Sequence, residues 1–114
     1  MAISNTAIDS TNTSIYASVG NNAITSLIVC NVVVFDPANP LAGQTELYLY
    51  VVPSADVNEL ITLPRHTIVN GLPIPAGETV MFDQEKMVLS NGDHIFAKSG
   101  SLTNLVVTVS TLAV

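Results

Sequence analysis

The stretch that decides the fold is AITSLIVCNVVVF at residues 23–35. Almost every side chain in it is apolar or β-branched, and β-branched residues pack better on a pleated sheet than in a helix. The run is longer and more uniformly apolar than a strand with one wet face, so it predicts a central strand covered on both faces. Within it, Asn31 is predicted to mark a β-bulge, and Cys30 is predicted to be buried with a protonated, unreactive thiol.

The segment after this run is a dense cluster of turn-forming residues, DPANPLAGQ at 36–44. It is longer than the roughly two to five residues usual in a hairpin, so it is predicted to project from the body of the domain. The next segment, TELYLYVV at 45–52, alternates cleanly between apolar and other side chains. A strand there places its two leucines on one face and its two tyrosines on the other.

The rest of the chain carries short β-type segments separated by turn residues, and no segment has a strong helical pattern. Together these patterns predict an all-β fold, a single β-sandwich or jelly roll of about eight short strands. Pro64 is predicted to lie in an edge strand, and Pro75-Ala76-Gly77 to form a tight turn with proline second and glycine fourth. Other predicted strands cover 14–18, 60–63, 79–82, 86–89, 94–98 and 105–110.

The first residues, Met1 to Asn12, show neither helical nor strand periodicity. Ile3 and Ile8 are isolated apolar side chains in this polar segment. The pattern predicts an extended N-terminal arm over residues 1–12, followed by the β-sandwich domain over residues 13–114. We expect the arm to become ordered on a partner by adding a strand to an exposed sheet edge.

Composition restricts the class of protein. The length of 114 residues is that of one domain. Hydrophobic residues make up 48% of the chain and charged residues 11%, which excludes an intrinsically disordered protein, and a single cysteine excludes a disulfide scaffold. Three basic residues against nine acidic ones give a formal net charge of −6, which removes the electrostatic basis for binding nucleic acid.

The scarcity of charge also bears on assembly. Soluble monomers usually spread more charge over their surface, so this composition predicts that other protein molecules cover part of it. We expect a homo-oligomer, most simply a trimer, and the alternative is a monomer coated with serine and threonine. The N-terminus lacks a signal-peptide pattern, and no apolar run reaches the ~20 residues of a transmembrane helix, so no membrane partner is expected.

Side chains suited to catalysis or metal binding are few. His66 and His94 belong to no HExxH or histidine-rich cupin motif and are predicted to be structural. Asp83, Glu85 and Asp93 would converge on Ca²⁺ if their turns lay at one end of the sandwich, but they lack the spacing of a calcium loop and are predicted to be solvated. We therefore expect no catalytic residue, no cofactor and no metal.

A set of short segments runs from NTAIDS (5–10), SIYAS (14–18), AITSL (23–27) and CN (30–31) through YVVPS (50–54) and IPAGET (74–79) to EKMVL (85–89), NGDHI (91–95) and VTVS (107–110). This succession resembles small structural proteins of the virions of tailed bacteriophages, particularly of cyanophage type. The likeness spans the whole chain, except that the connection at 36–44 is longer than in that family. The resemblance implies a β-sandwich with a non-enzymatic role in the virion, made in the host cytoplasm.

Three functions follow as hypotheses. The first is a capsid decoration or cement protein that binds the major capsid protein or another virion protein. The second is an adaptor or host-attachment module of the neck, tail or a fibre. The third is a carbohydrate-binding domain, with Tyr16, Tyr48 and Tyr50 on its sugar face, or a small metal-dependent enzyme. The residues predicted to contact a partner are Ile3, Ile8, Phe35, Pro37, Pro40 and Leu41.

Overall fold

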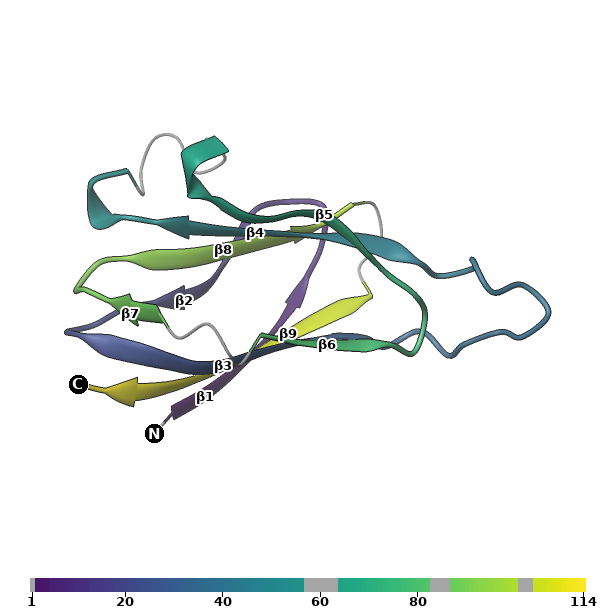
Figure 1. Ribbon diagram of the computed structural model, residues 1–114, viewed down its shortest axis with the longest axis horizontal. Coiled ribbons are helices and arrows are strands. Elements are labelled where there is room, and N and C mark those ends of the chain that lie inside the picture. The colour runs from purple at the N-terminus through teal and green to yellow at the C-terminus, as the bar shows by residue number, and fades with distance from the viewer. Residues whose placement is uncertain (1, 57–63, 83–86, 101–103) are drawn as a thin grey trace.

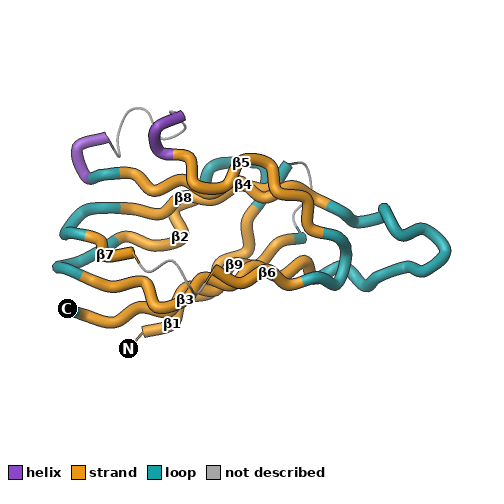
Figure 2. Tube along the Cα trace, viewed as in Figure 1, coloured by secondary structure: helices purple, strands orange, loops and turns teal. Residues whose placement is uncertain are grey.

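The computed structural model describes residues 2–56, 64–82, 87–100 and 104–114. Two antiparallel sheets pack face to face in a molecule that measures 48 × 30 × 20 Å (Figure 1). Strands make up nearly all of the regular structure, and the short helical turns lie on the connection after the fourth strand (Figure 2). The all-β sandwich predicted from the sequence is confirmed.

Sheet A has five strands in the order β1-β9-β3-β6, with β7 also pairing with β3. Its strands are β1 (Ala2–Ile8), β3 (Asn22–Asn31), β6 (Thr79–Phe82), β7 (Met87–Leu89) and β9 (Leu105–Ala113). Sheet B has four strands in the order β2-β8-β4-β5. Its strands are β2 (Thr13–Ala17), β4 (Thr45–Val52), β5 (Thr67–Ile74) and β8 (His94–Ser99).

The connections between these strands define a jelly roll. Strands β6 and β7 follow one another along the same strand, β3, and count as one interrupted strand. Each sheet then has four strands, and the chain crosses to the other sheet at every connection except β4–β5. This is the strand order of an eight-stranded jelly roll, the more specific of the two predicted architectures.

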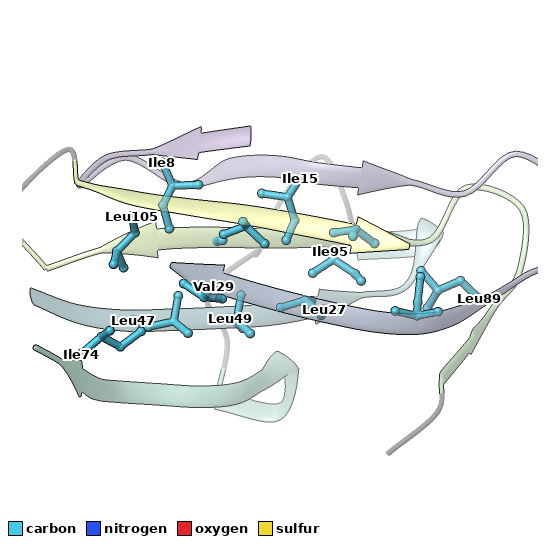
Figure 3. Close-up of a cluster of buried hydrophobic side chains, with 14 residues drawn as sticks. Ile8, Ile15, Leu27, Val29, Leu47, Leu49, Ile74, Leu89, Ile95 and Leu105 are labelled. Carbon is cyan, nitrogen blue, oxygen red and sulfur yellow. The ribbon is translucent and has the colours of Figure 1, made fainter. Parts of the chain in front are cut away.

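The core lies between the two sheets (Figure 3). It forms because inward-facing side chains alternate with outward-facing ones along each strand. In β4, Leu47 and Leu49 are 0% and 1% exposed and face this core, while Tyr48 and Tyr50 point to the other side, as predicted. The other buried members are Ile8, Ile15, Ile24, Leu27, Val29, Ile74, Leu89, Ile95, Ala97, Leu105, Val107 and Val109.

The N-terminal segment belongs to the sandwich, which corrects the prediction of an extended arm over residues 1–12. Strand β1 pairs antiparallel with β9 without a register shift, from Ala2 opposite Thr111 to Ile8 opposite Leu105. Ile8 is 1% exposed and packs in the core. The β-sandwich therefore begins at Ala2, and not at residue 13.

Strand β3 is central in sheet A, as predicted, but the described residues cover only one of its faces. Its inward residues are buried, and Ile28 and Cys30 on the outward face are half-buried. The predictions of a doubly covered strand and of a fully buried Cys30 are therefore wrong. The register shift of β3 lies between Ile24 and Ser26, so Asn31 does not mark the bulge.

The two proline-containing connections differ in detail from the sequence prediction. Pro64 starts a short 3-10 helix, η2 (Pro64–His66), and so it does not lie in an edge strand; the strand predicted over 60–63 lies outside the described residues. In the β5–β6 turn, the Glu78 amide donates to the Pro75 carbonyl at 3.1 Å. Pro75 is thus first and Gly77 third, where its φ of +77° suits a type II turn.

Candidate functional site

The connection between β3 and β4, residues 32–44, projects from one end of the sandwich, as predicted (Figures 1 and 2). We call it the projecting loop. Phe35 is 47% exposed and Leu41 is 74% exposed, and Pro37 and Pro40 between them are also exposed. The structure therefore brings four of the six predicted contact residues together on one protruding segment.

The projecting loop has a defined conformation because its own backbone closes successive turns. The Asp36 carboxylate accepts a hydrogen bond from the Ala38 amide at 2.9 Å, and the Asn39 amide donates to the Asp36 carbonyl at 3.1 Å. A second turn follows, in which the Ala42 amide donates to the Asn39 carbonyl at 3.0 Å. These bonds define the backbone of the loop from Asp36 to Ala42.

Asn31 anchors the base of the projecting loop. Its side chain is 1% exposed, and its Nδ2 donates to the carbonyls of Gly43 at 2.8 Å and Ile74 at 2.9 Å. Its Oδ1 accepts from the Val33 amide at 3.1 Å. Asn104 adds a further bond from its Nδ2 to the Gly43 carbonyl at 2.9 Å. One buried amide thus ties the start of the loop, its end and strand β5 together.

Gly43 is required at the end of the loop for two reasons. Its φ is +78°, a region that side chains rarely adopt, and a Cβ there would lie 2.7 Å from Cγ1 of Val33. The close approach lets the Gly43 carbonyl reach both Asn31 and Asn104.

The two remaining predicted contact residues lie elsewhere. Ile3 is 67% exposed on β1, near the N-terminus and at the far end of the molecule from the projecting loop (Figure 1). Ile8 is in the core and is not available to a partner.

A second surface, which the sequence prediction missed, is the outward face of sheet A. None of the described residues on this face carries a charge. Strand pairing and alternating burial define its members. We call it the sheet A face, and it consists of Ile3, Asn5, Ala7, Ala23, Ser26, Ile28, Cys30, Thr79, Met81, Val88, Val106, Thr108, Ser110 and Leu112.

The outward face of sheet B is different because it carries aromatic and charged side chains. The His94 ring stacks on Phe96 with centroids 5.4 Å apart, and Lys98 Nζ lies 5.0 Å from the Tyr48 ring centroid. Tyr50 is buried in a small apolar cluster, and this burial, followed by the effect of Tyr48, raises its pKa. Tyr16 packs against the core between the sheets, so the three tyrosines proposed for a sugar face do not share one face.

The two predicted structural histidines have local partners. His94 Nδ1 lies 3.0 Å from Ser14 Oγ across the β2–β8 pair. His66 is 3% exposed, and its Nε2 lies 2.9 Å from Asp56 Oδ2, which also accepts from Arg65 at 3.0 Å. Asp56 ends the 3-10 helix η1 (Ser54–Asp56), so this cluster links η1 to η2.

This cluster predicts an acid-sensitive link. The hydrogen bonds from Arg65 and then from His66 lower the pKa of Asp56 below its ordinary value of 3.8. A lowered folded-state pKa means that the link is complete above the unfolded-state value and is lost as the pH falls through the lower folded-state value. In an NMR titration, we expect the Asp56 carboxyl carbon to titrate below 3.8, with a concerted change in the His66 ring signals. A midpoint at or above that value, or identical His66 signals in Asp56→Asn, would contradict the assignment.

The carboxylates proposed for Ca²⁺ are placed only in part. Asp93 uses both side-chain oxygens locally, because Oδ1 accepts from the Ser54 amide at 3.0 Å and Oδ2 from the Ser90 amide at 2.9 Å. Asp83 and Glu85 lie outside the described residues. Within the described part of the chain, no group of three or more His, Cys, Asp or Glu side chains is placed to hold a metal ion.

An apolar cavity of about 300 Å³ opens between the sheets. Its lining residues, which carry no polar side chain, are Leu27, Leu49, Ile68, Val69, Phe82 and Met87. Ligand sites normally add a few polar groups that fix orientation, and the described lining supplies none.

In the ranges that the structure describes, no helix has the length and apolar character needed to cross a membrane. Comparison with known proteins gives no match to a family model, to a curated protein or to a solved structure.

Proposed function

We propose that this chain is a non-enzymatic structural protein of a tailed-bacteriophage virion, most simply a capsid decoration or cement protein. It binds a neighbouring virion protein, such as the major capsid protein, through the projecting loop. The jelly roll supports this proposal because the fold is frequent among capsid proteins, although it serves other functions as well. The resemblance of its sequence segments to small phage structural proteins points in the same direction.

The observation that carries the proposal is the construction of the projecting loop. A loop with no partner gains nothing from exposing Phe35 and Leu41, since apolar side chains in water favour burial. Here the loop also carries an internal set of turns and a buried amide anchor at its base. A rigid apolar projection loses little conformational entropy on binding, which suits a permanent contact within an assembly.

The described titratable side chains support a structural role over catalysis. Asp56 and His66 join two helical turns, and Asp93 caps backbone amides. The exposed Ser14 Oγ and His94 Nδ1 are 3.0 Å apart, but neither this pair nor the other two arrangements lines the apolar cavity.

The loop contact is tested by rebinding the protein to virus particles that lack it. Burying a leucine or phenylalanine side chain contributes roughly 1.5–3 kcal/mol, so Phe35→Ser with Leu41→Ser should weaken binding by about a hundredfold or more. The matched control is Val19→Ser, because Val19 is 86% exposed and lies in the β2–β3 connection, outside the loop. Co-sedimentation measures the affinity and the copy number.

Copy number separates the two virion hypotheses. If binding saturates at one copy, or one oligomer, for each cluster of capsid subunits, the result supports a decoration protein. Saturation at a few copies per particle supports the neck, tail or fibre alternative. Absence of binding by the wild-type protein, or equal loss in the loop variant and the Val19→Ser control, would contradict the proposal.

A further inference from the structure

The sheet A face carries no charge among the described residues, and the proposed function does not use it. We propose that it packs against the same face of a second copy of this chain. The contact is a sheet-on-sheet pairing of two identical faces on which none of the described residues is charged.

The distribution of charge selects a second copy as the occupant. The chain has a formal net charge of −6, so two copies repel one another over most of their surfaces. Sheet B carries Glu46 and Lys98, and the connections carry the described aspartates and Glu78. On the sheet A face, two acidic chains touch without placing described like charges together. A basic partner would instead be expected to meet complementary acidic side chains, and this face has none among the described residues.

The face is also apolar enough and large enough for a stable pair. Its exposed aliphatic and methionine side chains include Ile3 at 67%, Val88 at 66% and Met81 at 57%. Strand β9 has nine residues, so the face is roughly 30 Å long at about 3.3 Å per residue. Four strand widths of about 4.8 Å make it roughly 19 Å wide. The projected area is therefore roughly 600 Å², which is of the same order as the ~800 Å² per partner of a standard interface.

The edge of this face adds an independent observation. Exposed edge strands normally carry a proline, a charge or a bulge that prevents pairing with other chains. Strands β2 and β5 at the edges of sheet B have register shifts, and β5 also contains Pro73. Strand β1 has no proline, no charged residue and no register shift. Strand β1 therefore leaves this side of sheet A open to approach by another chain.

A contact between identical faces is complete with two copies, because each copy covers the face of the other and leaves no such face free. We therefore expect a dimer in place of the trimer expected from composition. It does not depend on the projecting loop.

The test places a charge at the centre of the face. Thr108 lies on β9 between Asn5 on β1 and Ile28 on β3. We expect the wild-type protein to sediment at twice its 12.0 kDa mass at micromolar concentration, and Thr108→Glu to raise the dimer dissociation constant at least a hundredfold. Asn70→Glu is the matched control, because Asn70 is an exposed residue of β5 in sheet B and the charge change is the same. Met81→Glu, at a 57% exposed position of the same face, serves as a second variant if Thr108→Glu fails to fold.

Cys30 reports on the same face without a charge change. It is half-buried there, so thiol labelling should be slow at concentrations where the chain is dimeric and faster on dilution. The concentration dependence should persist in Asn70→Glu and vanish in Thr108→Glu. A monomeric wild-type protein, an assembly of three or more copies, or equal dissociation of both glutamate variants would overturn the proposal. The Phe35→Ser/Leu41→Ser variant leaves the sheet A face intact. If this variant loses particle binding and remains a dimer, the result agrees with both assignments, the loop as the particle contact and the sheet A face as the dimer contact.

Discussion

Replacing Ile8 by alanine is expected to lower the free energy of unfolding by roughly 2–5 kcal/mol. Ile8 is 1% exposed and faces the core from the end of β1, paired in register with Leu105 of β9. Truncation removes its burial and leaves a cavity between the two sheets, which the rigid strands on either side only partly fill. For a domain of this size the loss is a large share of the total stability.

The matched control is Ile3→Ala in the same strand. Ile3 is 67% exposed, so its truncation should change the stability of the monomer by no more than about 0.5 kcal/mol. Urea denaturation followed by circular dichroism measures both variants, at a protein concentration low enough to exclude association. An Ile8→Ala cost as small as that of Ile3→Ala would mean that the N-terminal segment is an arm and not a strand of the sandwich.

The N-terminal strand could not be found from the sequence because it lacks an alternating pattern. The inward positions of β1 are Ala2, Ser4, Thr6 and Ile8, and only Ile8 is buried. The first half of the strand is exposed on both faces, so the fold does not require large apolar side chains there. By contrast, strand β4 runs through the middle of sheet B, and its bounds of Thr45–Val52 match the prediction.

The misassigned face of β3 has a different origin. Apolar and small neutral residues on both faces predict a strand covered twice, but a sequence does not distinguish cover from its own chain and cover from another molecule. Within the described chain the outward Ile28 and Cys30 remain half-buried. The same residues are part of the sheet A face, so the excess of apolar side chains that misled the prediction is also what indicates the contact between copies.

For the projecting loop, too, one feature could be predicted from neighbouring residues, and another depends on residues far apart in the sequence. The position of the loop can be predicted from its prolines, its glycine and Asp36, because these residues favour turns in the backbone next to them. Its anchor cannot be predicted in this way, because Asn31 bonds to the backbone at Gly43 and at Ile74, 12 and 43 residues away. Hydrogen bonds of a single side chain across such separations leave no periodic signal in the sequence.

Asn31→Ala is therefore the second change for which we expect a large effect. It removes three hydrogen bonds of a side chain that is 1% exposed. The Gly43 carbonyl keeps its bond from Asn104, whereas the Ile74 carbonyl and the Val33 amide each lose a partner. Since an unsatisfied buried polar group costs roughly 1–3 kcal/mol, the expected loss of stability is about 2–5 kcal/mol.

The control for this change is Asn5→Ala, which removes the acceptor of one exposed bond, from Thr108 Oγ1 at 2.8 Å. It should cost less than about 1 kcal/mol. Limited proteolysis separates the two roles of Asn31, which are stabilising the sandwich and anchoring the loop. Under conditions in which the sandwich stays folded, we expect Asn31→Ala to be cleaved in the projecting loop and Asn5→Ala to resist cleavage. Because binding through a loop without its anchor must first restore the lost order, Asn31→Ala should also weaken particle binding while Phe35 and Leu41 are unchanged. If Asn31→Ala unfolds like Asn5→Ala and its loop resists cleavage equally, the turns inside the loop suffice to hold it and the anchor is not needed.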